Sequence, residues 1–526
     1  MALGLQVPII RRKRAAMRAP VSTAQIVPAP VGGWNSRDAL GAMNEMDAVT
    51  LTNWFPGTSS CDLRNGYTQH ATGFTGQCES LLVYNGASAN AMFAFAGTAA
   101  YTVTTAGAVG AAQLSGLTNA RWQHINVATT AGKYLMAVNG ADKAAFYTGS
   151  AWARDGDGAP YDITGVDSAD CIQINLFKNM VWLVEDATLT AWYLAAGTIG
   201  GAATAFRLNG IARKGGYLVA MGTWTIDAGY GVDDLAVFVT SQGEVIVYRG
   251  TDPASTATWA LVGVWSIGSP VGRRCLVPFA GDLLIITQDG LWPLSGALQS
   301  SRVNPRVALS DKIQPSFAQA VTSYGANYGW QVFHFPQENQ LYVNVPVNAG
   351  SAQQQYVMNV VNRAWCNFTG WSANCFALLN DQMYFGANGY VARAWNTNAD
   401  NSAVITGFGL QAFNYFKDFT HDKRCTMMRP SLITNGIPAL SGSINTDFDL
   451  SEPSAALAFT PNRAGKWGSG TWGTATWGSG AVVSQNWQGV STHGRCLAPA
   501  LKAAAAGITL SWLSTTVVYE RAVGLL

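Results

Sequence analysis

The stretch LLVYNGASANAMFAFAGTAAYTVTTAG, residues 81–107, decides the expected fold. Short apolar and aromatic runs alternate in it with Gly, Asn and Ser, which is typical of strands of roughly four to seven residues joined by tight turns. The same texture returns along the chain at intervals of roughly 40–50 residues. The further examples are residues 122–152, 172–197, 235–250, 275–296, 330–350 and 356–395.

This repeat predicts a mainly β fold, a β-propeller built of short antiparallel blades. The interval is the one expected of propeller blades, and radial stacking gives each small sheet a neighbour on both of its faces. Turns such as Asn139-Gly140, Gln242-Gly243 and Asn388-Gly389 mark the hairpins. A stack of β-sandwiches with a coincidental period is the alternative. The number of blades, roughly five to seven, stays open.

The expected organisation has four parts. Residues 1–31 form an extended basic arm, and residues 32–77 form a segment that leads into the propeller and braces it. Residues 78–400 form the propeller itself. Residues 401–526 form an additional β domain, or strands that pack back on the propeller, and period-2 alternation predicts a strand at 508–519.

The composition of the 526 residues supports a turn-rich β fold. Only 12% of them are charged, where about 25% is typical, whereas the chain contains 19 Trp, 18 Tyr, 21 Phe and 56 Gly. The low charge indicates either a surface covered by neighbouring subunits or a neutral, polar surface. The net charge of +2 gives no overall attraction to nucleic acid or membranes.

Motifs for catalysis or metal binding are missing from the sequence. It contains no P-loop, no HExxH and no GxSxG. The eight Cys form no CxxC pair and are expected to be reduced and buried, and the five His are scattered. We therefore expect no enzyme activity, no metal site and no cofactor. The sequence contains no apolar run of about 18 residues, so we expect no membrane span.

Six carboxylates support an alternative function, because propeller glycosidases use a pair of acids. The candidates are Asp155, Asp157, Glu185, Asp186, Asp233 and Asp234. Aspartates that bond the backbone of their own turns explain these positions equally well. A glycan-binding propeller or a glycoside hydrolase is therefore the alternative function.

Two further clusters are candidates for interfaces. The first is the basic cluster Arg11, Arg12, Lys13 and Arg14, which suits phosphate contacts or docking on a partner protein. The second is Trp467, Trp472 and Trp477, spaced by five residues. A subunit boundary, a buried core and a glycan-stacking platform are three explanations of this tryptophan repeat.

The passage NWFPGTSSCDLRNGY, residues 53–67, resembles the beginning of the tail nozzle proteins of short-tailed phages. This family is also known as tail tubular protein B or packaged-DNA stabilisation protein. The matching positions are Asn53, Pro56, Arg64, Gly66 and Tyr67. Residues 221–250, 356–395 and 511–526 are similar to later passages of the family, so the resemblance touches 32–526 discontinuously.

The resemblance implies an architecture rather than a reaction. It implies a homo-oligomeric ring, with six subunits expected, below the portal and adaptor rings and in contact with tail fibre or tail tip proteins. The ring would retain packaged double-stranded DNA and form the channel for its ejection. The resemblance also implies a place in the virion, in the phage tail, after assembly in the host cytoplasm.

Overall fold

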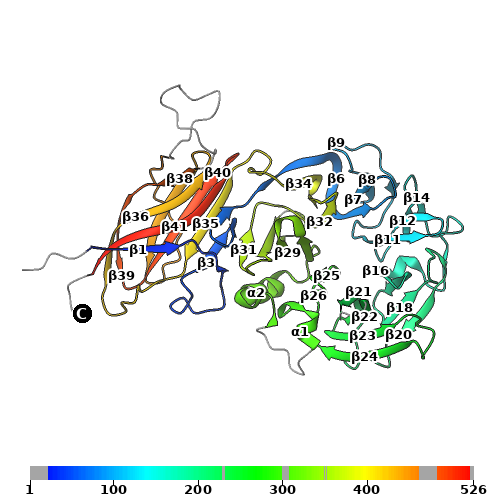
Figure 1. Cartoon of the computed structure of the whole chain (residues 1–526). Helices are drawn as coiled ribbons and strands as arrows, with labels where there is room; N and C mark the ends of the chain where they lie inside the picture. Colours follow the sequence, from blue (N-terminus) through cyan, green and yellow to red (C-terminus); the bar gives the residue numbers. More distant parts are fainter. Residues whose placement is uncertain are drawn as a thin grey trace, which may run out of the picture.

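The computed structural model describes residues 22–227, 232–298, 307–348, 350, 352–460 and 482–521. Strands dominate these residues, as the composition predicts. Figure 1 shows two bodies side by side, a ring of small sheets and a sandwich of longer strands. The expected mainly β fold with a β-propeller is confirmed.

Seven small antiparallel sheets form the ring within the described residues, and we number them blades 1 to 7. Blades 3 to 7 each consist of strands that follow one another in the chain. Blade 3 contains β11 (Gln123–Thr129), β12 (Gly132–Val138), β13 (Ala145–Tyr147) and β14 (Trp152–Arg154). Blade 4 contains β16 (Cys171–Phe177), β17 (Met180–Glu185), β18 (Thr190–Tyr193) and β20 (Thr204–Arg207). Blade 5 contains β21 (Leu218–Asp227), β22 (Val232–Thr240), β23 (Glu244–Gly250) and β24 (Trp259–Ser266). Blade 6 contains β25 (Leu276–Phe279), β26 (Asp282–Thr287) and β27 (Gly290–Pro293), and blade 7 contains β28 (Gln331–Phe335), β29 (Gln340–Asn348), β30 (Ala352–Asn359) and β31 (Trp365–Phe368).

Blades 1 and 2 share one long strand, β6 (Gly66–Tyr84). The first part of β6 pairs with β34 and thereby completes blade 1, whereas its last part pairs with β7 and belongs to blade 2. The other strands of blade 1 are β32 (Cys375–Leu379), β33 (Gln382–Gly386) and β34 (Asn388–Thr397). Those of blade 2 are β7 (Ala91–Ala96), β8 (Ala99–Thr102) and β10 (Leu114–Ser115), and β9 (Gly107–Ala108) pairs with β6. The ring is therefore closed by strands from distant parts of the sequence.

The innermost strands of the blades surround the axis of the ring. They are β6, β11, β16, β21, β25, β28 and β32, and each contacts the next around the circle. The strand that follows the innermost one is buried on both faces, as in β17 (MVWLV) and β26 (LLIIT), because a blade packs against both of its neighbours. The outermost strand β24 is largely exposed. This decrease of burial from the inner to the outer strands explains why apolar runs and more polar segments alternate along the sequence.

The sandwich combines both ends of the chain. Its first sheet contains β1 (Ser22–Pro28), β4 (Trp54–Pro56), β5 (Cys61–Leu63), β36 (Lys423–Thr434), β38 (Val482–Gln485), β39 (Gln488–Gly494) and β41 (Leu510–Arg521). The second contains β2 (Gly33–Trp34), β3 (Asp47–Thr52), β35 (Ile405–Gln411), β37 (Ala439–Thr446) and β40 (Leu497–Ala505), and it is continuous with blade 7 because β3 pairs with β31. Blue β1 lies along red β41 in Figure 1. The strand expected at 508–519 is confirmed as β41.

Two tryptophans fill the core of the sandwich. Trp54 and Trp512 are fully buried, and their ring centroids lie 5.8 Å apart. Strand β35 provides room for them with two glycines, because a Cβ atom at Gly409 would lie 2.8 Å from the ring of Trp512. A Cβ atom at Gly407 would lie 2.9 Å from the indole nitrogen of Trp54. Large rings and missing side chains are thus matched across the two sheets.

Short helices accompany blades 6 and 7. They are α1 (Leu294–Leu298), α2 (Gln314–Tyr324) and the 3-10 turns η3 (Asp311–Ile313) and η4 (Pro336–Glu338), whereas the 3-10 turn η1 (Ser168–Asp170) precedes β16 of blade 4. Phe317 of α2 is buried against Trp330 and Tyr356 of blade 7. A further pair of short strands, β15 (Ile163–Thr164) and β19 (Gly201–Ala202), connects the loops of blades 3 and 4.

Candidate functional site

The passage that carries the family resemblance forms a buried hub around Arg64. The guanidinium group binds both carboxylate oxygens of Asp400, at 2.8 and 2.6 Å. Its remaining N–H groups donate to Asn53 Oδ1 and to the carbonyls of Asn65 and Thr369. All five donors of Arg64 are therefore used, in a site where the side chain is 1% exposed.

The other residues of the passage complete the hub. Asn53 has a φ of +58° and joins strand β3 to β4. Its amide nitrogen donates to the hydroxyl of Thr369 and to the carbonyl of Thr406. A Cβ atom at Gly66 would lie 2.0 Å from the carbonyl oxygen of Ala399, so only glycine fits there. The hub thereby connects the sandwich to blades 7 and 1.

Tyr67 and Pro56 extend these connections into the two bodies. The ring of Tyr67 lies 5.1 Å from that of Phe385 in blade 1. The carbonyl of Pro56 accepts a hydrogen bond from Asn359 of blade 7. All five matching positions thus serve the junction of propeller and sandwich. The sequence had indicated only a turn at Arg64-Asn65-Gly66, because nothing in it points to Asp400 as the partner of Arg64.

A second candidate site lies on the axis of the propeller. It is a cavity of about 220 Å³, and every innermost strand or its leading residue contributes to its wall. The lining residues are Leu81, Trp122, Gln123, His124, Gln173, Ile174, Ala220, Arg273, Arg274, Leu276, Gln331, Val332, Cys375 and Phe376. The axis of the propeller therefore contains a cavity that is lined by residues from all seven blades.

Two arginines that precede β25 of blade 6 reach across the axis. Arg274 Nη2 donates to the carbonyl of Glu79 at 2.8 Å and to the hydroxyl of Ser80 at 2.6 Å, both in blade 2. Arg273 Nη1 donates to the carbonyl of Asn139, which directly follows β12 of blade 3, at 3.2 Å. Blade 6 is thereby tied to blades on the opposite side of the ring. Sequence reasoning missed this pair, although two adjacent arginines before an apolar strand are conspicuous in a chain with so little charge.

Glutamine side chains join neighbouring innermost strands around the cavity. Gln173 donates to the carbonyl of Met221 at 2.9 Å and accepts from its N–H at 3.1 Å. Gln331 makes the same pair of bonds with Phe376, at 3.2 and 3.0 Å. Each amide replaces a missing backbone partner between two blades, so these glutamines satisfy the innermost strands without a continuous sheet.

His124 is the titratable imidazole of this cavity. Its Nε2 accepts a hydrogen bond from the N–H of Val83 at 3.3 Å. Burial, together with the positive charge of Arg274, lowers the pKa of His124 to about 4. The imidazole is therefore neutral at pH 7, and the charge of the cavity comes from its arginines.

This pKa makes the stability of the fold dependent on pH. Between pH 6.5 and about 4 the unfolded chain binds a proton at His124 and the folded chain does not, so the free energy of unfolding falls as the pH falls through this range. In a His124→Gln variant the glutamine oxygen can accept from Val83 without titrating. From pH 7 to pH 4.5 we expect the wild type to lose up to ~3 kcal/mol more than the variant. Urea unfolding of both proteins at the two pH values measures this difference, and equal losses would contradict it.

The carboxylates of the loop after blade 3 are engaged in local hydrogen bonds. Asp155 is buried and accepts from the N–H of Ile163 at 2.8 Å and from the hydroxyl of Ser168 at 2.6 Å. Asp157 accepts from the N–H of Arg154 at 2.7 Å. These contacts are those of turn aspartates that hold their own loop.

The other candidate carboxylates contact their own or an adjacent blade. Glu185 accepts from the indole N–H of Trp192 at 2.9 Å. Asp234 pairs with Lys178 at 2.7 Å across blades 4 and 5. Asp186 is exposed in the turn after β17. Four of the five candidates whose side chains are described, Asp155, Asp157, Glu185 and Asp234, thus have structural partners.

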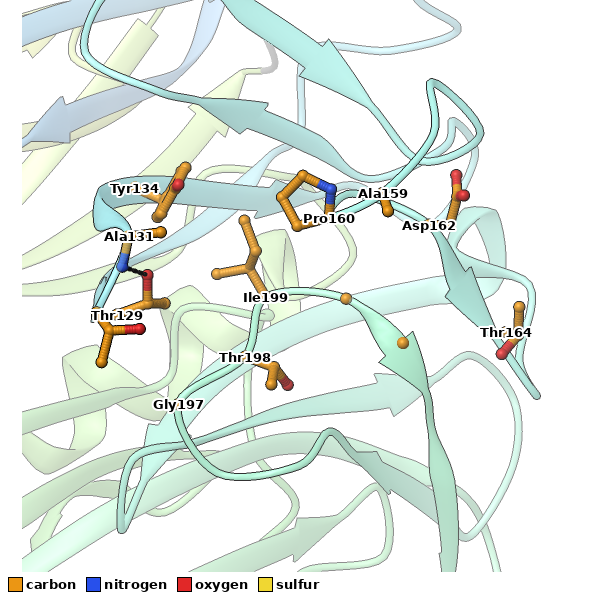
Figure 2. Close-up of a pocket in the computed structure, with 13 residues that line it drawn as sticks. Thr129, Ala131, Tyr134, Ala159, Pro160, Asp162, Thr164, Gly197, Thr198 and Ile199 are labelled. Carbon is orange, nitrogen blue, oxygen red and sulfur yellow. Dashed lines mark hydrogen bonds between the residues drawn. The ribbon is translucent and has the colours of Figure 1, made fainter.

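A larger pocket of about 410 Å³ opens between the loops of blades 3 and 4 (Figure 2). Tyr134 and Ile199 face its interior, and Pro160 lies at the opposite wall. Its ionisable residue besides tyrosine is Asp162, which accepts a hydrogen bond from the N–H of Gly158 at 3.0 Å. Binding pockets combine an apolar wall with a few converging polar groups. The wall of this pocket is mainly apolar, and few polar side chains converge on it.

Several sequence candidates lie outside the described residues. They are Arg11, Arg12, Lys13, Arg14, Trp467, Trp472 and Trp477, together with the side chain of Asp233. Their proposed roles at interfaces stay predictions. All eight Cys lie in the described part of the chain, where they are buried and unpaired, as expected.

Over the described ranges, no three His, Cys, Asp or Glu side chains gather as they would around a metal ion. Among the helices of the same ranges, none has the length and apolar character needed to cross a bilayer.

The fold defines the class of protein, a seven-bladed β-propeller joined to a β-sandwich, within the residues described. No family model matches the chain, and no curated protein matches it. Similar solved structures include the β-propeller domain of Cps50 (Swd1) from Myceliophteria thermophila, with 11% identity and a TM-score of 0.37 over 63% of this chain and 100% of that chain. Others are Sqt1 from Saccharomyces cerevisiae (10%, 0.37, 63% and 98%) and YCF48 from Cyanidioschyzon merolae (10%, 0.32, 64% and 98%). At this level the similarity carries no functional information.

Proposed function

We propose that the protein is a structural subunit of a short-tailed phage tail. In this proposal several copies, six by the resemblance, form a nozzle ring below the portal and adaptor rings. The ring retains packaged DNA, forms the channel for its ejection and contacts tail fibre or tail tip proteins. The protein is accordingly not an enzyme, and it acts in the virion after assembly in the host cytoplasm.

The Arg64 hub is the observation that supports this proposal. The five positions that match the nozzle family lie together at one junction, although Arg64 and Asp400 are 336 residues apart. A passage that served catalysis would present exposed reactive groups, whereas this one fixes two β bodies relative to each other. A subunit of a ring that retains packaged DNA needs its two bodies to be rigidly coupled.

The closed axis of the propeller bears on where DNA would pass. Arg273 and Arg274 cross the axis, and the chamber of about 220 Å³ beside them has no room for a duplex. In the proposed ring the DNA channel is therefore formed between neighbouring copies and not inside any single propeller.

Sedimentation tests the proposal directly. A lysate of the cells that produce the protein is treated with nuclease and separated on a density gradient, and the fractions are probed for this chain. We expect the chain to sediment with DNA-filled particles. Particles made without the chain should lose their DNA to the nuclease, and the wild-type gene should restore DNA retention.

Recovery of the chain only in the soluble or secreted fraction would contradict the proposal. The glycan hypothesis would then be tested by a binding screen with the Asp155→Ala and Trp472→Ala variants. If the protein were a glycan hydrolase or lectin, these changes would abolish turnover or binding.

A further inference from the structure

The cavity on the propeller axis holds positive charge that no acidic side chain balances. Its lining includes Arg273 and Arg274 and, within the residues described, neither Asp nor Glu. Glu79 offers its carbonyl to Arg274, but its carboxylate pairs with Arg121 at 3.2 Å. His124 is neutral at pH 7 and adds no charge. Burying cations without a counter-charge is costly, so the cavity favours an anion.

Two buried donors of the cavity lack acceptors. Arg274 Nη1 and the amide nitrogen of Gln123 have no hydrogen-bond partner among the described residues. The other terminal nitrogen of Arg274 has three acceptors, the carbonyls of Glu79 and Trp122 and the hydroxyl of Ser80. The guanidinium group is therefore held in place by one nitrogen while the other stays free. Buried donors in native proteins nearly always have partners, so the free pair indicates a missing one.

Gln123 differs in this respect from its counterparts in other blades. Gln173 and Gln331 also line the cavity, and each amide nitrogen donates to a backbone carbonyl of the next blade. The amide nitrogen of Gln123 makes no such bond within the described part of the chain. It therefore lacks the acceptor that the amide nitrogens of its counterparts have.

We propose that this cavity binds a small oxyanion, a phosphate or a carboxylate. Guanidinium groups match the paired oxygens of both anions, and an amide N–H adds a third donor. The volume of about 220 Å³ lies below the ~300–1,000 Å³ of pockets for drug-sized ligands, so one small anion with a few waters fits. The anion connects Arg274 of blade 6 to Gln123 of blade 3 and completes the closure of the axis.

Calorimetric titration of the purified full chain tests this inference. Sodium phosphate and sodium acetate are titrated separately in Tris chloride at constant ionic strength, with sodium chloride as the blank. We expect one phosphate or one acetate to bind per chain, and the anion that binds identifies the source of the oxygens. Absence of binding by both anions would overturn the proposal.

Substitutions locate the binding site. Arg274→Gln should weaken binding at least tenfold, whereas Arg207→Gln removes the same charge from the exposed outer strand of blade 4 and should leave the affinity within twofold. Equal affinities of these two variants would overturn the proposal. If Arg274→Gln does not fold, as judged by circular dichroism, Gln123→Leu decides. This change removes the whole side-chain amide with its free donor and leaves both arginines in place, and it should weaken binding about fivefold. Unchanged affinity would then overturn the site. The test is independent of any role in a phage tail.

Discussion

Replacement of Arg64 by leucine should destabilise the protein by about 3–5 kcal/mol, the cost of breaking a buried ion pair from one side. The change leaves the carboxylate of Asp400, whose side chain is 12% exposed, with the indole N–H of Trp371 as its remaining donor in the hub. It also removes the guanidinium group from above the ring of Trp371, 5.1 Å from its centroid. Urea unfolding at pH 7, followed by tryptophan fluorescence, measures the loss.

Two variants provide the controls for this prediction. Arg37→Leu breaks exposed ion pairs with Asp38 and Asp311 and should cost less than ~1 kcal/mol. The double variant Arg64→Leu with Asp400→Asn should be more stable than the sum of the single losses predicts, because the unpaired charge is removed. An Arg64→Leu protein as stable as Arg37→Leu would show that the hub does not hold the two bodies together.

Replacement of Trp512 by alanine should cost about 3–5 kcal/mol, the usual price of truncating a fully buried large aromatic side chain. Trp512 is 0% exposed, contacts Trp54 and donates its indole N–H to the hydroxyl of Thr515 at 3.1 Å. The loss should appear in the same urea experiment. Trp487→Ala is the matched control, because Trp487 is 43% exposed and should contribute less than ~1 kcal/mol.

The glycine opposite Trp512 makes this prediction more specific. Gly409→Ala alone should destabilise by about 1–3 kcal/mol, because the new methyl group would lie 2.8 Å from the indole ring. In the Trp512→Ala background the same methyl group enters vacated space and should cost little or nothing. Additive losses in the double variant would contradict the proposed contact between the two positions.

The propeller could be predicted from the sequence because its information is local. Each blade from 3 to 7 consists of consecutive short strands, so their turns and apolar runs repeat in order. The burial of a whole strand on both faces, as in β17, gives a short unbroken apolar run, and its length and the flanking turn residues identify it as a strand. The eight buried Cys were expected on different grounds, because the sequence contains no CxxC pair.

The sandwich and the hub could not be predicted in the same way, because their contacts are remote in sequence. Strand β1 pairs with β41, and β3 pairs with β35, with most of the propeller between the members of each pair. Arg64 looked like part of a turn, since its acceptor Asp400 lies in another body of the fold. The positive charge on the axis could not be predicted either, because the sequence does not show that Arg274 reaches Ser80 across the ring. Pairings of this kind leave no periodic trace.

The pairing of β1 with β41 also means that the first strand of the sandwich cannot pair until synthesis of the chain is nearly complete. The hydroxyl of Ser22 binds the carboxylate of Glu520, 498 positions later. At roughly 5–20 residues per second, a ribosome delivers the second partner roughly 25–100 s after the first. Blades 2 to 6 can form on the growing chain, but β1 and β3 to β5 must wait with unpaired edges until β35 and β41 emerge. We therefore expect the nascent chain to need a chaperone at its first strands, and we expect chains that stop before residue 510 to be degraded before they can enter any assembly.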